Sequence, residues 1–328
     1  MQITLEQLED ARVLLRQYFA PTPLVPARSL GDDADAVFLK LETGLPTGSF
    51  KVRGALYALS THLRTDTRTE VTAASTGNHG AAVAWAASLL HLPATIFVPR
   101  NPNPVKAQRI RDLGARLVEI GTDLTAAIDA AAEYAARAGA FFLHDASSPL
   151  VPIGAGTIGL EVVESLPSVQ TIYVPMGDTA LIRGVASAAK HLVPGVRIVG
   201  VVAERAPAYF LSWQRRVAVE TASAGTIADG LAVRRALQSN VDDICALVDD
   251  VVCVSDEQML AAIRRLMREE LIDAEPAGAA ALAGLLLTRD QGSTATALPW
   301  VGASVALVTG GNLAPDLRAE LAASGGGR

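Results

Sequence analysis

The runs Ile172-Tyr173-Val174 and Ile198-Val199-Gly200-Val201-Val202 are short, almost wholly apolar and rich in β-branched residues. Such continuous apolar runs are typical of parallel strands, because a parallel sheet buries both of its faces. From Val37 onward, similar runs alternate with alanine-rich stretches of helical character. This is the pattern of parallel strands joined by crossover helices, so the sequence predicts an open α/β fold.

The periodicity gives approximate bounds for these elements. A capping-box pattern, Thr4-Leu5-Glu6-Gln7, predicts a helix near the N-terminus that ends before Pro21. Further helices are expected over Asn78–Leu90, Leu124–Ala138 and Asp256–Glu270. The expected strands are Val37–Glu42, Val71–Ala74, Ala94–Val98, Arg116–Ile120, Phe141–His144, Thr171–Pro175, Val196–Ala203 and Ser304–Thr309.

Composition narrows the functional classes. The chain has 328 residues, of which 50% are hydrophobic and 19% charged, with a net charge of -6 and no basic block. This balance argues against a nucleic-acid partner and against a membrane partner, and favours a small molecule. Cys245 and Cys253 show neither a metal-ligand spacing nor a disulfide framework, so a cytoplasmic location is expected. The longest apolar stretch, Ala279–Leu287, is too short to span a bilayer.

Polar and glycine-containing motifs follow several of the expected strands. Lys51 lies in Ser49-Phe50-Lys51-Val52-Arg53-Gly54, between an aromatic residue and the start of a helix. Three other segments follow strands: Ser75-Thr76-Gly77-Asn78-His79-Gly80, Gly177-Asp178-Thr179-Ala180-Leu181 and Thr309-Gly310-Gly311-Asn312. Backbone N–H groups at the start of a helix favour an anion. Together the motifs predict a cofactor site.

In this order, from about Pro21 to Asn312, the motifs resemble the fold-type II pyridoxal-phosphate enzymes, specifically the serine/threonine dehydratase and serine racemase group. The resemblance implies pyridoxal 5'-phosphate as cofactor, two open parallel-sheet lobes with flanking helices, and a homodimer. It places residues 43–146 in a small lobe, inserted in a large cofactor-binding lobe of residues 1–42 and 147–328.

The resemblance also assigns roles. Lys51 forms the internal Schiff base and serves as base at the substrate α-carbon, and Phe50 lies near the cofactor ring. Thr309 meets the pyridine nitrogen. Because desolvation favours a neutral amine, a lowered pKa is expected for Lys51.

The loop after the expected strand Val71–Ala74 is assigned to the substrate. Its residues Ser75, Thr76, Gly77, Asn78 and His79 bind the substrate carboxylate, and Asn78 also bonds the phenolic oxygen of the cofactor. Thr76 is a second catalytic candidate, because racemases of the group have a serine there that works on the opposite face of the ring.

The phosphate loop departs from the family pattern. Gly177, Asp178, Thr179, Ala180 and Leu181 are assigned to the cofactor phosphate, although relatives have four successive glycines here. Side chains restrict positive φ, and an aspartate repels a dianion. Asp178 is therefore expected to turn away and cap the following helix, while the Thr179 hydroxyl donates to the phosphate.

Two other motifs are rejected. Gly154-Ala155-Gly156-Thr157-Ile158-Gly159 fits a dinucleotide-binding fingerprint, but Pro149 and Pro152 separate it from the preceding strand. A metal is not expected. Serine racemases hold a divalent ion with a glutamate and an acidic residue six positions later, where this chain has Glu204 and Phe210.

These motifs predict a lyase that converts a small β-hydroxy amino acid, of the threonine or serine type, to a 2-oxo acid and ammonia. An amino-acid racemase, a β-replacement enzyme and an inactive amino-acid-binding homologue remain open, as does the identity of the amino acid. Because the sequence ends soon after Asn312, no regulatory domain like that of biosynthetic threonine dehydratases is expected.

Overall fold

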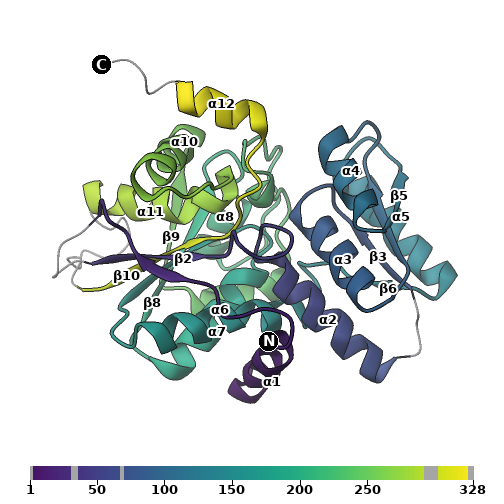
Figure 1. Cartoon of the computed structure of the whole chain (residues 1–328), viewed down its shortest axis with the longest axis horizontal. Coiled ribbons are helices and arrows are strands. Elements are labelled where there is room, and N and C mark those ends of the chain that lie inside the picture. Colours follow the sequence, from purple (N-terminus) through teal and green to yellow (C-terminus); the bar gives the residue numbers. More distant parts are fainter. Residues whose placement is uncertain (1–2, 31–35, 67–69, 292–301, 324–328) are drawn as a thin grey trace.

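The computed structural model describes residues 3–30, 36–66, 70–291 and 302–323, and within them the strands form two separate sheets. In Figure 1 the smaller sheet lies to the right with α3, α4 and α5, and the larger sheet lies to the left. The observed architecture is the α/β fold, with parallel sheets and flanking helices, that the sequence predicts. The lobe boundaries at residues 42/43 and 146/147 stay a prediction.

The larger sheet has six strands in the order β1-β2-β10-β7-β8-β9. Only the pairing of β1 with β2 is antiparallel among the described strands. Its strands are β1 (Leu24–Pro26), β2 (Val37–Leu41), β7 (Thr171–Pro175), β8 (Arg197–Ala203), β9 (Asp250–Val254) and β10 (Ser304–Val308). Strand β2 therefore pairs with β10, from the opposite end of the sequence.

The smaller sheet has four parallel strands in the order β5-β4-β3-β6. They are β3 (Val71–Ala74), β4 (Ala94–Val98), β5 (Arg116–Glu119) and β6 (Phe141–Phe142). All residues of β3 and β4 are buried, which explains their continuous apolar runs.

Helices cover both faces of the larger sheet. In Figure 1, α10 and α11 lie on one face and α6 and α7 on the other, and each layer has its own cluster of buried residues. The helices are α1 (Leu5–Leu15), α2 (Lys51–Thr65), α3 (Asn78–Leu89), α4 (Pro104–Asp112), α5 (Leu124–Ala138), α6 (Val151–Ser165), α7 (Ala180–Leu192), α8 (Ala208–Arg215), α9 (Gln238–Leu247), α10 (Asp256–Arg265), α11 (Pro276–Gln291) and α12 (Pro315–Ala323).

Most of the expected elements are present within one or two residues, and Thr4 forms the predicted capping box. The sequence analysis does not predict β1, which has three residues and includes Pro26, or β9, whose run Val251–Val254 follows two acidic residues. The expected helix Asp256–Glu270 is α10 followed by a π-helical turn, which ends at Leu271 with φ +61°.

The rejected fingerprint lies inside α6, where its glycines allow close helix packing. A Cβ atom at Gly154 would lie 2.5 Å from the carbonyl oxygen of Arg53 in α2, and one at Gly159 would lie 2.6 Å from that of Val185 in α7. The facing Gly184 of α7 meets α6 in the same way. Gly154 therefore lets α6 lie close to α2, the helix that begins with Lys51, while Gly159 and Gly184 let α6 lie close to α7.

Two features that bear on function are absent from the described ranges: a membrane-spanning helix and a cluster of metal ligands. Among their helices, none has the length and apolar character needed to cross a membrane. In these same ranges no three His, Cys, Asp or Glu side chains gather as a metal site would require.

Candidate active site

The first and last predicted motifs lie side by side. Ser49 forms an isolated antiparallel bridge with Gly310, and the Phe50 N–H donates to the carbonyl oxygen of Thr309 at 3.0 Å. Thr309 follows the end of β10 and is buried. The start of α2 is thus held directly against the end of β10, in the larger sheet.

A chain of side-chain amides ties the second motif to the same place. Asn78, the first residue of α3, donates through Nδ2 to the Glu275 carboxylate and accepts from Asn312 Nδ2 at 2.7 Å. Arg109 Nη1 in turn donates to Asn312 Oδ1 at 2.7 Å. Burial raises the pKa of Glu275. Neither Arg109 nor this contact of Glu275 is predicted from the sequence.

The loop between β3 and α3 presents groups of two kinds. Ser75, Thr76 and Gly77 are half-buried, and the Ser75 hydroxyl accepts from the Gly77 N–H at 3.1 Å. His79 is 6% exposed, and its Nε2 lies 3.0 Å from the carbonyl oxygen of Leu143. Burial lowers the pKa of His79, so its ring is neutral near pH 7. The carboxylate-binding role of this loop stays a prediction.

Lys51 begins α2, and its ammonium group forms an ion pair with Asp145. The distance from Nζ to Asp145 Oδ2 is 2.5 Å, and the ring of Phe50 lies 5.3 Å from Nζ. Burial acts to lower the pKa of Lys51, but the charge and hydrogen bond of Asp145 outweigh it and raise this pKa. The expected lowered pKa is therefore wrong for the protein without cofactor, because the sequence analysis does not foresee Asp145.

The predicted phosphate loop holds one non-glycine residue at positive φ, Thr179. Thr179 has φ +69°, a left-handed conformation that costs a non-glycine residue free energy, and its buried hydroxyl has no hydrogen-bond partner in the described chain. A Cβ atom at Gly177 would lie 2.1 Å from the carbonyl oxygen of Gly230, so glycine is required there. Helix α7 begins at Ala180 with no side-chain cap.

Asp178 is not the helix cap that the sequence predicts. Its carboxylate instead lies in the field of Asp145 and Lys51. Burial and then the negative charge of Asp145 raise the pKa of Asp178 to about 7. Near neutral pH this carboxyl is therefore protonated in part of the molecules, which reduces its repulsion of an anion.

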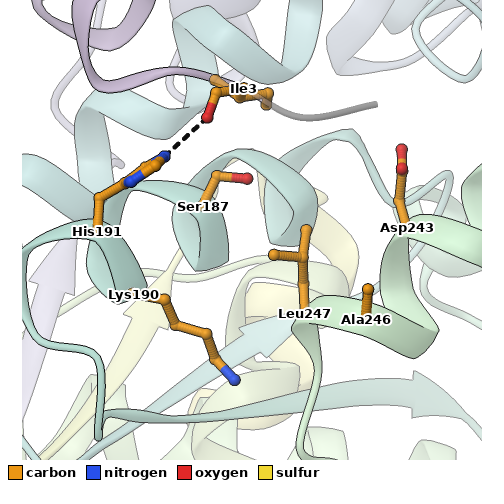
Figure 2. A pocket seen from close by; sticks show the side chains of 7 residues that line it. All are labelled: Ile3, Ser187, Lys190, His191, Asp243, Ala246 and Leu247. Carbon is orange, nitrogen blue, oxygen red and sulfur yellow. Dashed lines mark hydrogen bonds between the residues drawn. The ribbon is translucent and has the colours of Figure 1, made fainter.

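A pocket of about 370 Å³ lies elsewhere, where α7 and α9 meet Ile3, two residues before α1. Figure 2 shows Ser187, Lys190 and His191 of α7 and Asp243 of α9 around the pocket, with His191 in hydrogen-bond contact with the carbonyl oxygen of Ile3. Each of these polar side chains already has a partner within the chain. The pocket contains none of the predicted site residues.

Comparison with known proteins gives the family. The family model of pyridoxal-phosphate dependent enzymes matches residues 15–308. The chain belongs to this family. It is 38% identical to an L-threonine ammonia-lyase of Geobacter sulfurreducens and 36% identical to one of Thermotoga maritima. These alignments cover 93% and 95% of the chain and 75% and 76% of the relatives.

Solved structures agree with this assignment. A maize serine racemase superposes with a TM-score of 0.90 at 28% identity, over 99% of this chain and 98% of that one. The processed form of a threonine deaminase from Solanum lycopersicum gives a TM-score of 0.88 at 28% identity, over 98% of this chain and 88% of that one.

The residues present fit the family's cofactor. A phosphate needs hydrogen-bond donors, and the loop before α7 offers an unpartnered buried hydroxyl and an uncapped helix N-terminus. An aldehyde needs an amine, which Lys51 supplies beside the flat ring of Phe50. Partial protonation of Asp178 reduces the conflict between this loop and a dianion.

Proposed function

We propose that this pyridoxal-phosphate dependent enzyme is a lyase that converts a small β-hydroxy amino acid, threonine or serine, to a 2-oxo acid and ammonia. The observation that carries the proposal is an amine, Lys51, held beside the motif of Thr309, in a chain 38% identical to an L-threonine ammonia-lyase. The superposition with the threonine deaminase from Solanum lycopersicum supports the same reaction.

Residues from all the predicted motifs would hold the cofactor. Lys51 would bond its aldehyde, Phe50 would lie near its ring, and Thr309 would approach the ring nitrogen. Asn78 would bond its phenolic oxygen. Its phosphate would meet the loop Gly177, Asp178, Thr179, Ala180 and Leu181. When bound, pyridoxal phosphate supplies an electron sink for the charge that proton loss leaves on the substrate α-carbon.

The remaining steps belong to the chain. The Ser75 and Thr76 hydroxyls, the Gly77 N–H and the start of α3 at Asn78 orient the substrate carboxylate. Lys51 Nζ takes the α-proton and passes it to the β-hydroxyl, which departs as water. The bond from the β-carbon to oxygen breaks as the electron pair left on the α-carbon forms a double bond to the β-carbon. The unsaturated amine that is released reacts with water outside the site to give the 2-oxo acid and ammonia. The His79 ring is buried and its Nε2 faces the carbonyl oxygen of Leu143, so His79 would support this loop from the protein interior.

Racemisation is the second candidate. The superposition with a maize serine racemase favours it, as does the half-buried Thr76 in the loop next to Lys51's helix. A two-base racemase needs a proton donor on each side of the α-carbon, and the Thr76 hydroxyl would be the second one.

We also propose a homodimer in the cytoplasm, as the family resemblance and the two unpaired cysteines suggest. The molar mass of the loaded enzyme in solution, measured by light scattering, tests the dimer.

The test of function is a panel of purified amino acids, including L-threonine, L-serine, hydroxyaspartate and 2,3-diaminopropionate. We expect ammonia and 2-oxo acid in equal amounts from threonine or serine, and a visible absorption band from bound cofactor. Chiral analysis of the remaining substrate is the second readout. Faster appearance of the D-isomer than of 2-oxo acid would make racemisation the main reaction, and cofactor binding without any turnover would leave only a binding protein.

A further inference from the structure

Asp145 follows β6 in the chain and is the nearest charged group to Lys51. Its Oδ2 lies 2.5 Å from Nζ, and the two side chains are 11% and 15% exposed. Asp145 provides the hydrogen-bond acceptor for the Lys51 ammonium among the residues that the structure describes. An ion pair this close and this little exposed is stronger than a surface pair, because little water screens it.

The groups around the pair come from several elements. His79 of α3 places Nδ1 3.8 Å from Asp145 Oδ2, while its other nitrogen faces the carbonyl oxygen of Leu143. His144, the neighbour of Asp145, also acts on this carboxylate. Burial alone would raise the pKa of Asp145, but the Lys51 charge outweighs it and holds that pKa below the usual range.

Two more carboxylates act on Lys51 from the larger sheet side. They are Asp178, in the loop before α7, and Glu275, just before α11, and both are weaker influences than Asp145. Asp178 is partly protonated near neutral pH and Glu275 is bonded to Asn78. Asp145 is therefore the carboxylate with both the contact and the charge to control Lys51.

We propose that Asp145 is the positioning residue of Lys51: it orients the amine and stabilises the ammonium form that arises when Nζ takes the substrate's α-proton. In that step the Cα–H bond breaks, its electron pair stays on the substrate, and a new N–H bond forms on Nζ. The positive charge gained by Lys51 then faces the negative charge of Asp145. The role rests on the proposed function only in that the reaction begins with loss of an α-proton.

The consequence is testable without any substrate. Replacing Asp145 by asparagine keeps the size of the side chain and removes its charge, so burial then dominates and lowers the pKa of Lys51. We expect Lys51 in the cofactor-free, full-length variant to react with acetic anhydride at least about tenfold faster at pH 8 than in the wild type, since one pKa unit is a factor of ten. Peptide mass spectrometry would follow Lys51, with Lys190 as the internal reference.

The loaded enzyme gives the second readout. We expect Asp145→Asn to lower kcat at least about tenfold with KM within about twofold, and to shift the pH profile of kcat to lower pH. Asp145→Glu, which keeps the charge, should recover part of kcat. Asp112→Asn, an exposed acid on α4, should match the wild type in every measurement.

Equal Lys51 reactivity in wild type and Asp145→Asn would overturn the proposal, whatever amino acid the enzyme uses. If Asp145→Asn does not fold, the pH dependence of acetylation in the wild type decides. A midpoint for Lys51 below about 9, well under the ordinary pKa of about 10.4 for lysine, would overturn the proposal. A midpoint for Lys51 above that of Lys190 supports it. Lack of turnover on the amino-acid panel, with Lys51 reactivity as expected, would count against the lyase and not against the pair.

Discussion

Lys51 and Arg53 stand two residues apart on α2, and each belongs to a group of buried charges. Arg53 is 1% exposed and every one of its nitrogens has a partner: it bonds Glu42 and Glu161 at 2.7–3.0 Å, and also Thr157 and Thr22.

Lys40 completes this group, with Nζ 2.5 Å from Glu161 Oε2. The positive charges of Arg53 and Lys40 are then balanced by the negative charges of Glu42 and Glu161. Burial acts to lower the pKa of Arg53, but its two carboxylates raise it further above the usual range.

The Lys51 group is built differently. Lys51, Asp145 and Asp178 carry unequal charge, the Asp178 carboxyl is half protonated near pH 7, and Lys51 retains 15% exposure. Residues two apart on a helix point to different sides, so one helix can serve both groups. The Arg53 group, in which the charges balance and the Arg53 nitrogens are all hydrogen-bonded, stabilises the fold. The Lys51 group, in which the charges do not balance, leaves the Lys51 amine able to gain and lose a proton.

The largest effect should come from Lys51→Ala. Loss of the amine removes both the aldehyde partner and the base, so turnover should fall by about 10³-fold or more. The visible band of the bound cofactor should vanish as well. The unfolding free energy should fall less than for a change in the Arg53 group, because water reaches Asp145. Substantial turnover in the variant would remove Lys51 from the site.

Arg53→Met should have the next largest effect, on stability instead of chemistry. It leaves Glu42 and Glu161 buried with one cation between them, and breaking a buried pair in this way costs about 3–5 kcal/mol. Urea unfolding measures it. The matched control is Arg318→Met, whose exposed pair with Asp273 should contribute less than about 1 kcal/mol. Similar losses of unfolding free energy in Arg53→Met and Arg318→Met would show that the buried Arg53 group contributes no more to stability than an exposed ion pair does.

A smaller effect is expected from Thr76→Ala, which removes a neutral hydroxyl near the Lys51 group without altering its charges. Elimination should slow by a factor that corresponds to about 1–2 kcal/mol, since one hydrogen bond to the substrate carboxylate is lost. Inversion of the substrate, where the wild type shows it, should nearly disappear. Chiral chromatography beside a 2-oxo acid assay separates the two outcomes.

The smallest effect should come from a chelator. Asp145 and Asp178 are two carboxylates in one site, but the described residues contain no group of three His, Cys, Asp or Glu side chains arranged to hold a metal ion. Phe210 stands where racemases have an acidic metal ligand. Activity and melting temperature should therefore stay unchanged in chelator. A loss that magnesium or calcium restores would show that the chain has a metal site that the comparison at Glu204 and Phe210 misplaces.

The sequence predicts the fold better than the electrostatics of the site. Runs such as Ile172–Val174 are typical of buried parallel strands. Lys51, Asn78 and Thr309 could be found because their motifs, in this order along the chain, resemble those of a known family. Asp145 also follows a strand, but β6 has only two residues, so a single aspartate after it is a weak signal.

Hydrogen-bond and ion-pair partners that come from distant elements are harder still to predict from the sequence. The bonds of Arg53 to Glu42 and Glu161 depend on how α2 packs against β2 and α6, which no local pattern specifies. The same holds for Asp178. Local rules predict a helix cap, whereas burial and then the negative charge of Asp145, from the loop after β6, raise the pKa of Asp178.

The bridge between Ser49 and Gly310 also fixes when the site can form. Contacts between distant parts of a chain close last and slow folding, because the intervening segment loses entropy before the contact repays it. On the ribosome, Ser49 and α2 emerge early, but β10 and Gly310, which follows it, emerge long after them. The nascent chain therefore cannot offer a finished site to its cofactor, and capture of pyridoxal phosphate must wait until β10 has been synthesised.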